Sequence, residues 1–154
     1  MSAPRPIYER DGVAIYRGMA ELLAPRLGDF GVVLLDPPFS VGFGDYRDRM
    51  RPWMRTRDVI ALLNPLHGYM RIRDGEESNV LDTRFAPSEK IGHPKVRPLA
   101  IVRGLLETTT GRILDPYMGT GTTLLAALQL GREAVGIEIE DKWCRAAAER
   151  LRLA

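Results

Sequence analysis

The amino-acid sequence predicts an α/β fold in which a mostly parallel sheet carries helices on both faces. Short apolar runs alternate with segments of helical periodicity, and runs such as Val32-Val33-Leu34-Leu35 are apolar throughout, as in strands buried on both faces. Strands are expected at Val13–Tyr16, Val32–Leu35, Gly68–Arg73, Asn79–Asp82, Arg112–Leu114 and Glu133–Ile137. Helices are expected at Ala20–Ala24, Thr56–Leu63, Pro98–Glu107, Thr122–Leu130 and Asp141–Leu153.

Turn and stop signals place several boundaries of these elements. Gly131 follows the Thr122–Leu130 segment, and a glycine that adopts positive φ commonly ends a helix. Asp74-Gly75 is a turn signal between the two central strands. This central segment is therefore expected to form a hairpin that extends the sheet.

Composition and length indicate one domain that spans residues 1–154. A chain of 154 residues, 45% of them hydrophobic, can bury a sizeable core without crosslinks. Its single cysteine excludes an internal disulfide framework, and with two histidines it makes no zinc-binding set, so no metal site is expected. Because no run approaches the ~18 apolar residues of a membrane helix, we expect a cytoplasmic protein with no membrane partner.

A glycine-containing loop, Asp115–Thr123, lies between a predicted strand and a predicted helix. Gly119 and Gly121 would let the backbone approach a ligand closely, and the N-terminus of the following helix favours a carboxylate or phosphate. A Walker A loop is excluded, because Pro116 occupies the first glycine position and no lysine follows Gly121. The loop therefore predicts a cofactor site. The alternative is a nucleotide-binding fold that binds an adenosine compound of another kind.

A second segment that could take part in catalysis follows the predicted strand Val32–Leu35. It is Asp36-Pro37-Pro38-Phe39. Ligands of open α/β sheets bind at the carboxyl ends of the strands. The Asp36 carboxylate and the Pro37 carbonyl are two acceptors that could orient an exocyclic base amine, and the prolines hold them in place. Phe39 could stack on a base extruded from its helix. The alternative is an ordinary exit from a strand into a turn.

These segments resemble motifs of the DNA amino-methyltransferases. Asp115–Thr123 resembles motif I, Gly136–Glu140 resembles motif II, and Asp36–Phe39 resembles motif IV. His93–Ala100 resembles motif X, with Arg97 where the family usually has lysine. Tyr16-Arg17-Gly18-Met19 resembles a segment that normally ends in Gly-Asp, so Met19 replaces an acid that the family uses to recognise adenosine.

The resemblance implies a Rossmann-like class I methyltransferase fold with the permuted motif order IV, X, I, II of the β class. It also implies that the parallel strands beginning at Val13, Glu133, Arg112 and Val32 are neighbours in that order. The implied cofactor is S-adenosylmethionine, with Glu138 accepting hydrogen bonds from the ribose hydroxyls. The implied cofactor-binding residues are Gly18, Asp36, His93, Arg97, Asp115, Pro116, Tyr117, Gly119, Thr120, Gly121, Thr122, Thr123 and Glu138. The implied catalytic residues are Asp36, Pro37, Pro38 and Phe39.

The resemblance further implies methyl transfer to DNA, with adenine N6 favoured over cytosine N4 because motif IV begins with an acid. The alternatives are an RNA base-amine methyltransferase and a noncatalytic remnant that binds nucleic acid or cofactor. The segment at 40–78 is shortened and divergent from the family, so a homodimer could complete the grip on a duplex. Cationic residues and one tryptophan in this segment are the expected nucleic-acid contacts, the alternative being a solvated loop: Arg47, Arg49, Arg51, Trp53, Arg55 and Arg57.

Overall fold

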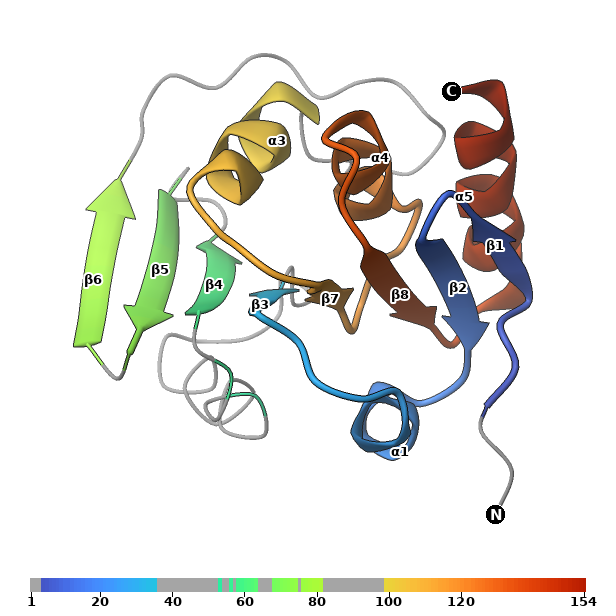
Figure 1. Cartoon of the computed structure of the whole chain (residues 1–154), viewed down its shortest axis with the longest axis horizontal. Helices are drawn as coiled ribbons and strands as arrows, with labels where there is room; N and C mark the ends of the chain where they lie inside the picture. The colour runs from blue at the N-terminus through green and yellow to red at the C-terminus, as the bar shows by residue number, and fades with distance from the viewer. Residues whose placement is uncertain are drawn as a thin grey trace.

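A computed structural model describes residues 4–35, 53, 56, 58–63, 68–74, 76–81 and 99–154, and in 61–63, 68–70 and 76–81 it describes the backbone alone. In this part of the chain the strands form one sheet in the order β1-β2-β8-β7-β3-β4-β5-β6 (Figure 1). The strands are β1 (Tyr8–Arg10), β2 (Val13–Arg17), β3 (Val32–Leu35), β4 (Asp58–Leu63), β5 (Gly68–Arg73), β6 (Glu76–Leu81), β7 (Ile113–Asp115) and β8 (Ala134–Glu138). None of the described helices is long and apolar enough to cross a membrane.

The centre of the sheet is parallel, and its strand order confirms the predicted one. β2 pairs with β8, β8 with β7, and β7 with β3, all in parallel. The registers place Arg17 opposite Glu138, Asp115 opposite Gly136 and Val33 opposite Leu114. Because the four strands run in one direction, their carboxyl ends share one edge of the sheet, which is called the carboxyl edge below.

An antiparallel extension continues the sheet beyond β3. β4 pairs in parallel with β3, and β5 and β6 follow as antiparallel strands. Arg73 lies opposite Glu76, so the predicted hairpin at Asp74-Gly75 is confirmed. The predicted helix at Thr56–Leu63 is wrong, because β4 occupies Asp58–Leu63. Val59 and Ile60 are fully buried in opposite cores, as expected of a strand covered on both faces.

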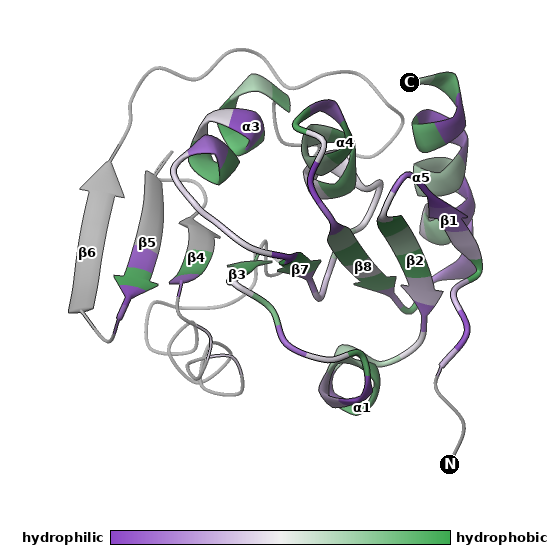
Figure 2. Cartoon of the chain, in the orientation of Figure 1, coloured by the Kyte–Doolittle hydropathy of each residue, from purple (hydrophilic) through white to green (hydrophobic). Residues whose placement is uncertain are grey.

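In the described part of the chain, three helices cover one face of the sheet and a short helix lies on the other (Figure 1). The first group is α3 (Leu99–Glu107), α4 (Thr122–Gln129) and α5 (Asp141–Leu153). On the second face, α1 (Ala20–Leu23) continues directly into a 3₁₀ turn at Ala24–Arg26. Hydrophobic residues dominate β2 and β8, whereas α5 alternates between hydrophobic and hydrophilic residues, as a helix with one covered side should (Figure 2).

Alternation along the strands divides the buried side chains into two cores. Ile15 of β2 and Ile113 of β7 pack with Leu106, Leu124 and other residues of α3, α4 and α5. Tyr16 of β2 and Ile137 of β8 belong to the second core, on the α1 side. The central strands are therefore packed on both faces, and the loops at the carboxyl edge begin where these strands end.

Two features of the fold differ from expectation at the level of single segments. The edge strand β1 was not predicted, since Tyr8–Arg10 is only three residues long. Trp53 is only 7% exposed and belongs to the core on the α1 side. Its burial does not support the expectation that the Trp53 ring stacks on a nucleic-acid base.

Candidate functional site

The glycine loop begins where β7 ends, at the carboxyl edge. Asp115 is buried, and its Oδ1 accepts a hydrogen bond of 3.1 Å from the Tyr117 backbone N–H. This turn, in which a side chain replaces a backbone acceptor, bends the chain out of the strand. Met118 N–H then donates to Ile137 O of β8 at 3.1 Å, and Gly121 N–H donates to Met118 O at 2.9 Å. The loop is therefore folded back over the end of β8.

Glu138, the last residue of β8, joins this loop to the neighbouring strand end. Its Oε2 accepts a hydrogen bond of 3.1 Å from Gly119 N–H, and its Oε1 accepts one of 2.8 Å from Glu140 N–H. Each carboxylate oxygen has two acceptor positions, so both oxygens retain capacity for a further donor. The carboxylate is thus fixed in orientation beside the glycine loop and is only partly buried.

The two glycines of the loop have different roles. Both have positive φ, of 51° at Gly119 and 77° at Gly121. A Cβ on Gly121 would lie 2.9 Å from the Ala147 Cβ of α5, so packing between helices requires this glycine. A Cβ on Gly119 would meet no atom of the described residues within 4 Å. Among the described residues, open space of the kind that a ligand could fill therefore lies at Gly119. Gly121 has a packing role, and its contact with a ligand stays a prediction.

Arg150 of α5 holds the second half of the loop. Its Nη1 donates to Thr120 O at 2.9 Å, to Thr120 Oγ1 at 3.2 Å and to Thr122 Oγ1 at 3.1 Å. Thr120, Thr122 and Thr123 are all buried. The hydroxyls of Thr120 and Thr122 thus bind α5 in this structure, which gives them a positioning role within the loop. Pro116 is buried as well.

The segment after β2 completes the described part of the carboxyl edge. Gly18 N–H donates to Glu138 O at 3.0 Å, so Gly18 lies directly beside the end of β8. On α1, Glu21 Oε1 accepts a hydrogen bond of 2.8 Å from the Tyr117 hydroxyl. This bond links α1 to the glycine loop across 96 residues of sequence. The structure therefore brings Gly18, the loop and Glu138 together, as predicted.

Other predicted site residues lie outside the described part of the chain. These are Asp36, Pro37, Pro38, Phe39, Arg47, Arg49, Arg51, Arg55, Arg57, His93 and Arg97. β3 ends at Leu35, at the same edge as the end of β7, because the two strands are parallel neighbours. Among the described residues, no group of three or more His, Cys, Asp or Glu is arranged to bind a metal ion.

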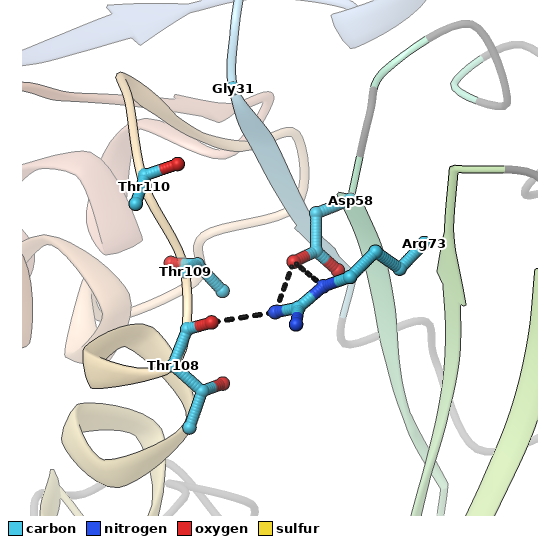
Figure 3. Close-up of a pocket in the computed structure, with 6 residues that line it drawn as sticks. All are labelled: Gly31, Asp58, Arg73, Thr108, Thr109 and Thr110. Atoms are coloured by element: carbon cyan, nitrogen blue, oxygen red, sulfur yellow. Dashed lines mark hydrogen bonds and ion pairs between the residues drawn. The ribbon is translucent and has the colours of Figure 1, made fainter.

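A hollow of about 160 Å³ lies at the opposite edge of the sheet, where the parallel strands begin (Figure 3). Its lining is Gly31, Asp58, Arg73, Thr108, Thr109 and Thr110. Asp58 accepts hydrogen bonds from Arg71 Nε at 2.7 Å and from Arg73 Nη2 at 2.9 Å, and Arg71 Nη2 also contacts it. The Asp58 side chain is only 6% exposed. Two arginines sharing one buried carboxylate indicate a structural ion network here.

This ion network also caps the C-terminal end of α3. Thr108 O accepts hydrogen bonds from Arg71 at 3.1 Å and from Arg73 at 2.6 Å. Arg132, in the loop before β8, donates to Leu106 O at 2.7 Å. Carbonyls at a helix C-terminus carry partial negative charge, so cations stabilise them. Burial lowers the pKa of Arg132. Its guanidinium N–H groups nonetheless donate hydrogen bonds to the carbonyls of Leu106 and Gly111.

Cys144, the lone cysteine, is fully buried in α5 near the backbone of Glu138. Burial, together with the nearby Glu138 and Asp141 carboxylates, raises the pKa of its thiol to about 11. The thiol lies 3.5 Å from Glu138 O as a weak donor. A protonated, inaccessible sulfur of this kind packs the helix against the strand and is not a nucleophile.

The family model for DNA methylases with N6 or N4 specificity matches residues 48–149, about two thirds of the chain. The chain belongs to this DNA methylase family. Among its relatives are the type II methyltransferases M.HindIII of Haemophilus influenzae, 36% identical over 77 residues, and M.ScaI of Streptomyces caespitosus, 39% identical over 66 residues. These alignments cover 48% and 41% of the chain but only 25% and 22% of the relatives. The chain therefore aligns with about a quarter of the length of these curated methylases.

Solved methylase structures share the fold. The complex of M1.HpyAVI with S-adenosylmethionine matches with a TM-score of 0.61 at 18% identity, over 90% of this chain and 99% of that one. The cytosine-N4-specific PvuII DNA methyltransferase matches with a TM-score of 0.68 at 13% identity, over 96% of this chain and 89% of that one. At these identities the similarity concerns the fold, and it confirms the predicted class I methyltransferase architecture.

Within this DNA methylase domain, sequence reasoning missed Arg150 and the Tyr117–Glu21 hydrogen bond. Both act on the glycine loop from elements that are distant in sequence, so only the packing of α5 and α1 reveals them. One feature of the sequence points to the Arg150 contact. Ala147 is a small residue that lets its side of α5 approach another segment closely, and Arg150 lies on the same side three residues later.

Proposed function

We propose that this protein transfers a methyl group from S-adenosylmethionine to the exocyclic amine of a base in DNA, with adenine N6 as the acceptor. One observation carries the proposal: the Glu138 carboxylate is held beside the glycine loop at the carboxyl edge, in a chain of the DNA methylase family. A carboxylate fixed by two backbone amides is an acceptor prepared for a vicinal diol.

The described residues fit the proposed cofactor in two further respects. Gly119 leaves open space beside Glu138, where an amino acid with a side chain would intrude. The N-cap of α4 is Gly121, which has no side chain to cap the helix, so the amides of the first turn suit a carboxylate such as that of a methionine moiety. S-adenosylmethionine would supply a methyl group bound to a positively charged sulfur, which is open to attack by a weak nucleophile.

The base would be oriented by motif IV, which follows β3 in the sequence. An exocyclic amine is a poor nucleophile, because its lone pair is delocalised into the ring. In the proposal, the Asp36 carboxylate and the Pro37 carbonyl accept the two amine hydrogens, which turns the lone pair out of the ring plane. Phe39 stacks on the base, and the rigid Pro37-Pro38 pair sets the acceptors before the base arrives.

The choice of adenine N6 rests on the acid at the start of motif IV. Asp36 stands where the family tends to have aspartate for adenine and serine for cytosine. The PvuII enzyme, which has a similar fold, is described as cytosine-N4-specific, so fold similarity does not favour adenine. The first residue of motif IV is therefore the feature that supports adenine.

Incubation with labelled S-adenosylmethionine and unmodified genomic DNA, followed by nucleoside analysis, tests the reaction, the polymer and the base together. N6-methyladenine is the expected product, and parallel reactions with RNA should show no transfer. The variant Asp36→Ala should lose methyl transfer while it keeps most of its cofactor affinity in calorimetry. Exclusive formation of N4-methylcytosine would refute the base assignment, and equal activity of the variant would refute the role of Asp36.

A further inference from the structure

Arg150 contacts the glycine loop at the point where α4 begins. Its Nη1 makes three hydrogen bonds there, to Thr120 O, Thr120 Oγ1 and Thr122 Oγ1. Thr120 and Thr122 flank Gly121, the N-cap of α4, and both are buried. One nitrogen of α5 therefore joins the residues before and after this N-cap.

The N-cap itself offers no side chain that could fix the first turn of α4. Gly121 adopts a φ of 77°, and no side-chain hydrogen bond caps the helix among the described residues. The first α-helical hydrogen bond runs from Leu125 N–H to Gly121 O, so the three amides before Leu125 have no acceptor within the helix. The direction of these amides depends on the backbone that Arg150 holds.

The Glu138 carboxylate is fixed by a different set of bonds. It accepts hydrogen bonds from Gly119 N–H at 3.1 Å and from Glu140 N–H at 2.8 Å. A diol suits such a carboxylate, whereas a ligand carboxylate suits the amides at a helix N-terminus. Two ends of one ligand would therefore depend on separate supports, and Arg150 belongs to the support at α4.

We propose that Arg150 is a positioning residue for the amino-acid part of S-adenosylmethionine. By fixing Thr120 and Thr122, it aims the first amides of α4 at the carboxylate of that part, and it acts through the loop and not by contact with the ligand. The inference rests on the proposed function. A lysine could take over much of this role, because a single nitrogen makes the three bonds and an ammonium has three N–H donors.

Two ligands that share the adenosine group and differ in the amino-acid part test the inference by calorimetry. S-adenosylhomocysteine carries that part, and methylthioadenosine lacks it. In Arg150→Met the affinity for S-adenosylhomocysteine should fall at least about tenfold, because the helix amides lose their alignment, whereas the affinity for methylthioadenosine should change by less than about threefold. Arg150→Lys should restore the affinity for S-adenosylhomocysteine to within about threefold of the parent's.

The matched control is Arg152→Met, two residues further along α5. The Arg152 side chain is 62% exposed and pairs with the exposed Glu149. Its loss removes the same charge from the same helix and should change the affinity for neither ligand.

Substitutions at Thr122 test the same link with Arg150 in place, should Arg150→Met not fold. Thr122→Val removes the hydroxyl that accepts from Arg150 and should weaken S-adenosylhomocysteine selectively, by about threefold, whereas Thr122→Ser should match the parent. If Arg150→Met folds, its loss of affinity and that of Thr122→Val should be less than additive in the double variant, because both remove one interaction.

Several results would overturn the inference. Equal weakening of both ligands in Arg150→Met would make Arg150 a support of the whole fold, and parental affinity for S-adenosylhomocysteine would show that the loop does not need it. Arg150→Lys binding as weakly as Arg150→Met would contradict the hydrogen-bonding role. With no folded Arg150→Met, equal affinities of Thr122→Val and Thr122→Ser would decide against it. Failure of the parent to bind S-adenosylhomocysteine at all would instead count against the proposed function.

Discussion

Gly119 and Gly121 lie two residues apart in the glycine loop and have different surroundings. Both need the left-handed backbone conformation, which costs a residue with a side chain about 1–2 kcal/mol. Only Gly121 is also closed in by a neighbouring helix, through the Ala147 Cβ at 2.9 Å from any added Cβ. A substitution at Gly121 therefore tests the fold, whereas a substitution at Gly119 tests the ligand space.

We predict that Gly119→Ala lowers the free energy of unfolding by about 1–2 kcal/mol and weakens S-adenosylmethionine binding beyond that effect. Gly121→Ala should destabilise the fold more, because α5 must shift to admit the methyl group. Urea denaturation measures the first quantity and calorimetry on the folded fraction measures the second. A Gly119→Ala protein with parental affinity would show that the space at Gly119 is not used by the cofactor.

The raised pKa of Cys144 predicts how the free energy of unfolding depends on pH. Its folded pKa of about 11 lies above the ordinary value of 9.0, so the folded state retains the thiol proton over a range in which the unfolded chain loses it. Stability from this group is therefore complete below about pH 9 and declines as pH rises toward 11. Cys144→Ala should show a shallower fall in the free energy of unfolding across this range than the parent does.

A thiol reagent provides the control for this prediction. The buried Cys144 should react at pH 8 only as fast as the protein unfolds, and at once in denaturant. Rapid labelling of the native protein would contradict its burial in α5.

At the scale of elements, the ion network of Asp58, Arg71 and Arg73 joins the antiparallel extension to α3. The Arg71 and Asp58 side chains are 11% and 6% exposed, so neither charge is well solvated. The same two arginines donate to Thr108 O, just after α3. The network thereby ties β4 and β5 to the helix that follows the predicted motif X.

We predict that Asp58→Asn destabilises the protein by about 3–5 kcal/mol, since Arg71 would keep its charge without its carboxylate partner. Glu107→Gln removes the partner of Arg103 in an exposed pair on α3, and should cost less than about 1 kcal/mol. Chemical denaturation of both variants gives the comparison. Equal, small losses would mean that the buried network contributes no more than a surface ion pair.

The sequence was informative about elements whose pattern had one interpretation. The Val32–Leu35 run and the alternation of strands with helices led to the correct parallel core, in the order that the family resemblance implied. The segment Val59-Ile60-Ala61-Leu62-Leu63 fits a buried helix as well as a buried strand, and it was assigned wrongly. The loop was located by its place between a predicted strand and a predicted helix, and Gly18 and Glu138 were located by the family resemblance. The Arg150 contacts were not, because they depend on how α5 packs against the loop, 30 residues away in sequence.

At the scale of the whole molecule, the basic segment at 47–57 remains the sequence-based candidate for the DNA contact. It carries five arginines and one acid, and phosphate contacts release counterions when they form. We predict that replacing Arg49, Arg51 and Arg55 together by alanine weakens DNA binding on unrelated sequences. The variant should also reduce the slope of affinity against salt concentration, while S-adenosylmethionine binding stays parental.

The control for this prediction is a triple variant on another surface, with Arg103, Arg145 and Arg152 changed to alanine. These arginines lie on α3 and α5 in exposed ion pairs, and their loss changes the net charge equally. If both triple variants lose affinity to the same extent, general charge and not the 47–57 segment governs binding. A dimer that completes the contact with DNA would appear in sedimentation as a complex with two protein chains per duplex.

The position of β8 and β7 between β2 and β3 has a consequence for the order of folding. On the ribosome, β2 and β3 emerge early, yet the strands that separate them in the sheet, residues 113–115 and 134–138, are synthesised later. On the sides that β8 and β7 later occupy, β2 and β3 must wait unpaired or pair wrongly, although β1 and β4 are already present on their other sides. Closure over such distances is slow. A nascent chain that stops before Glu138 cannot form the site, so cofactor binding should report the last step of folding.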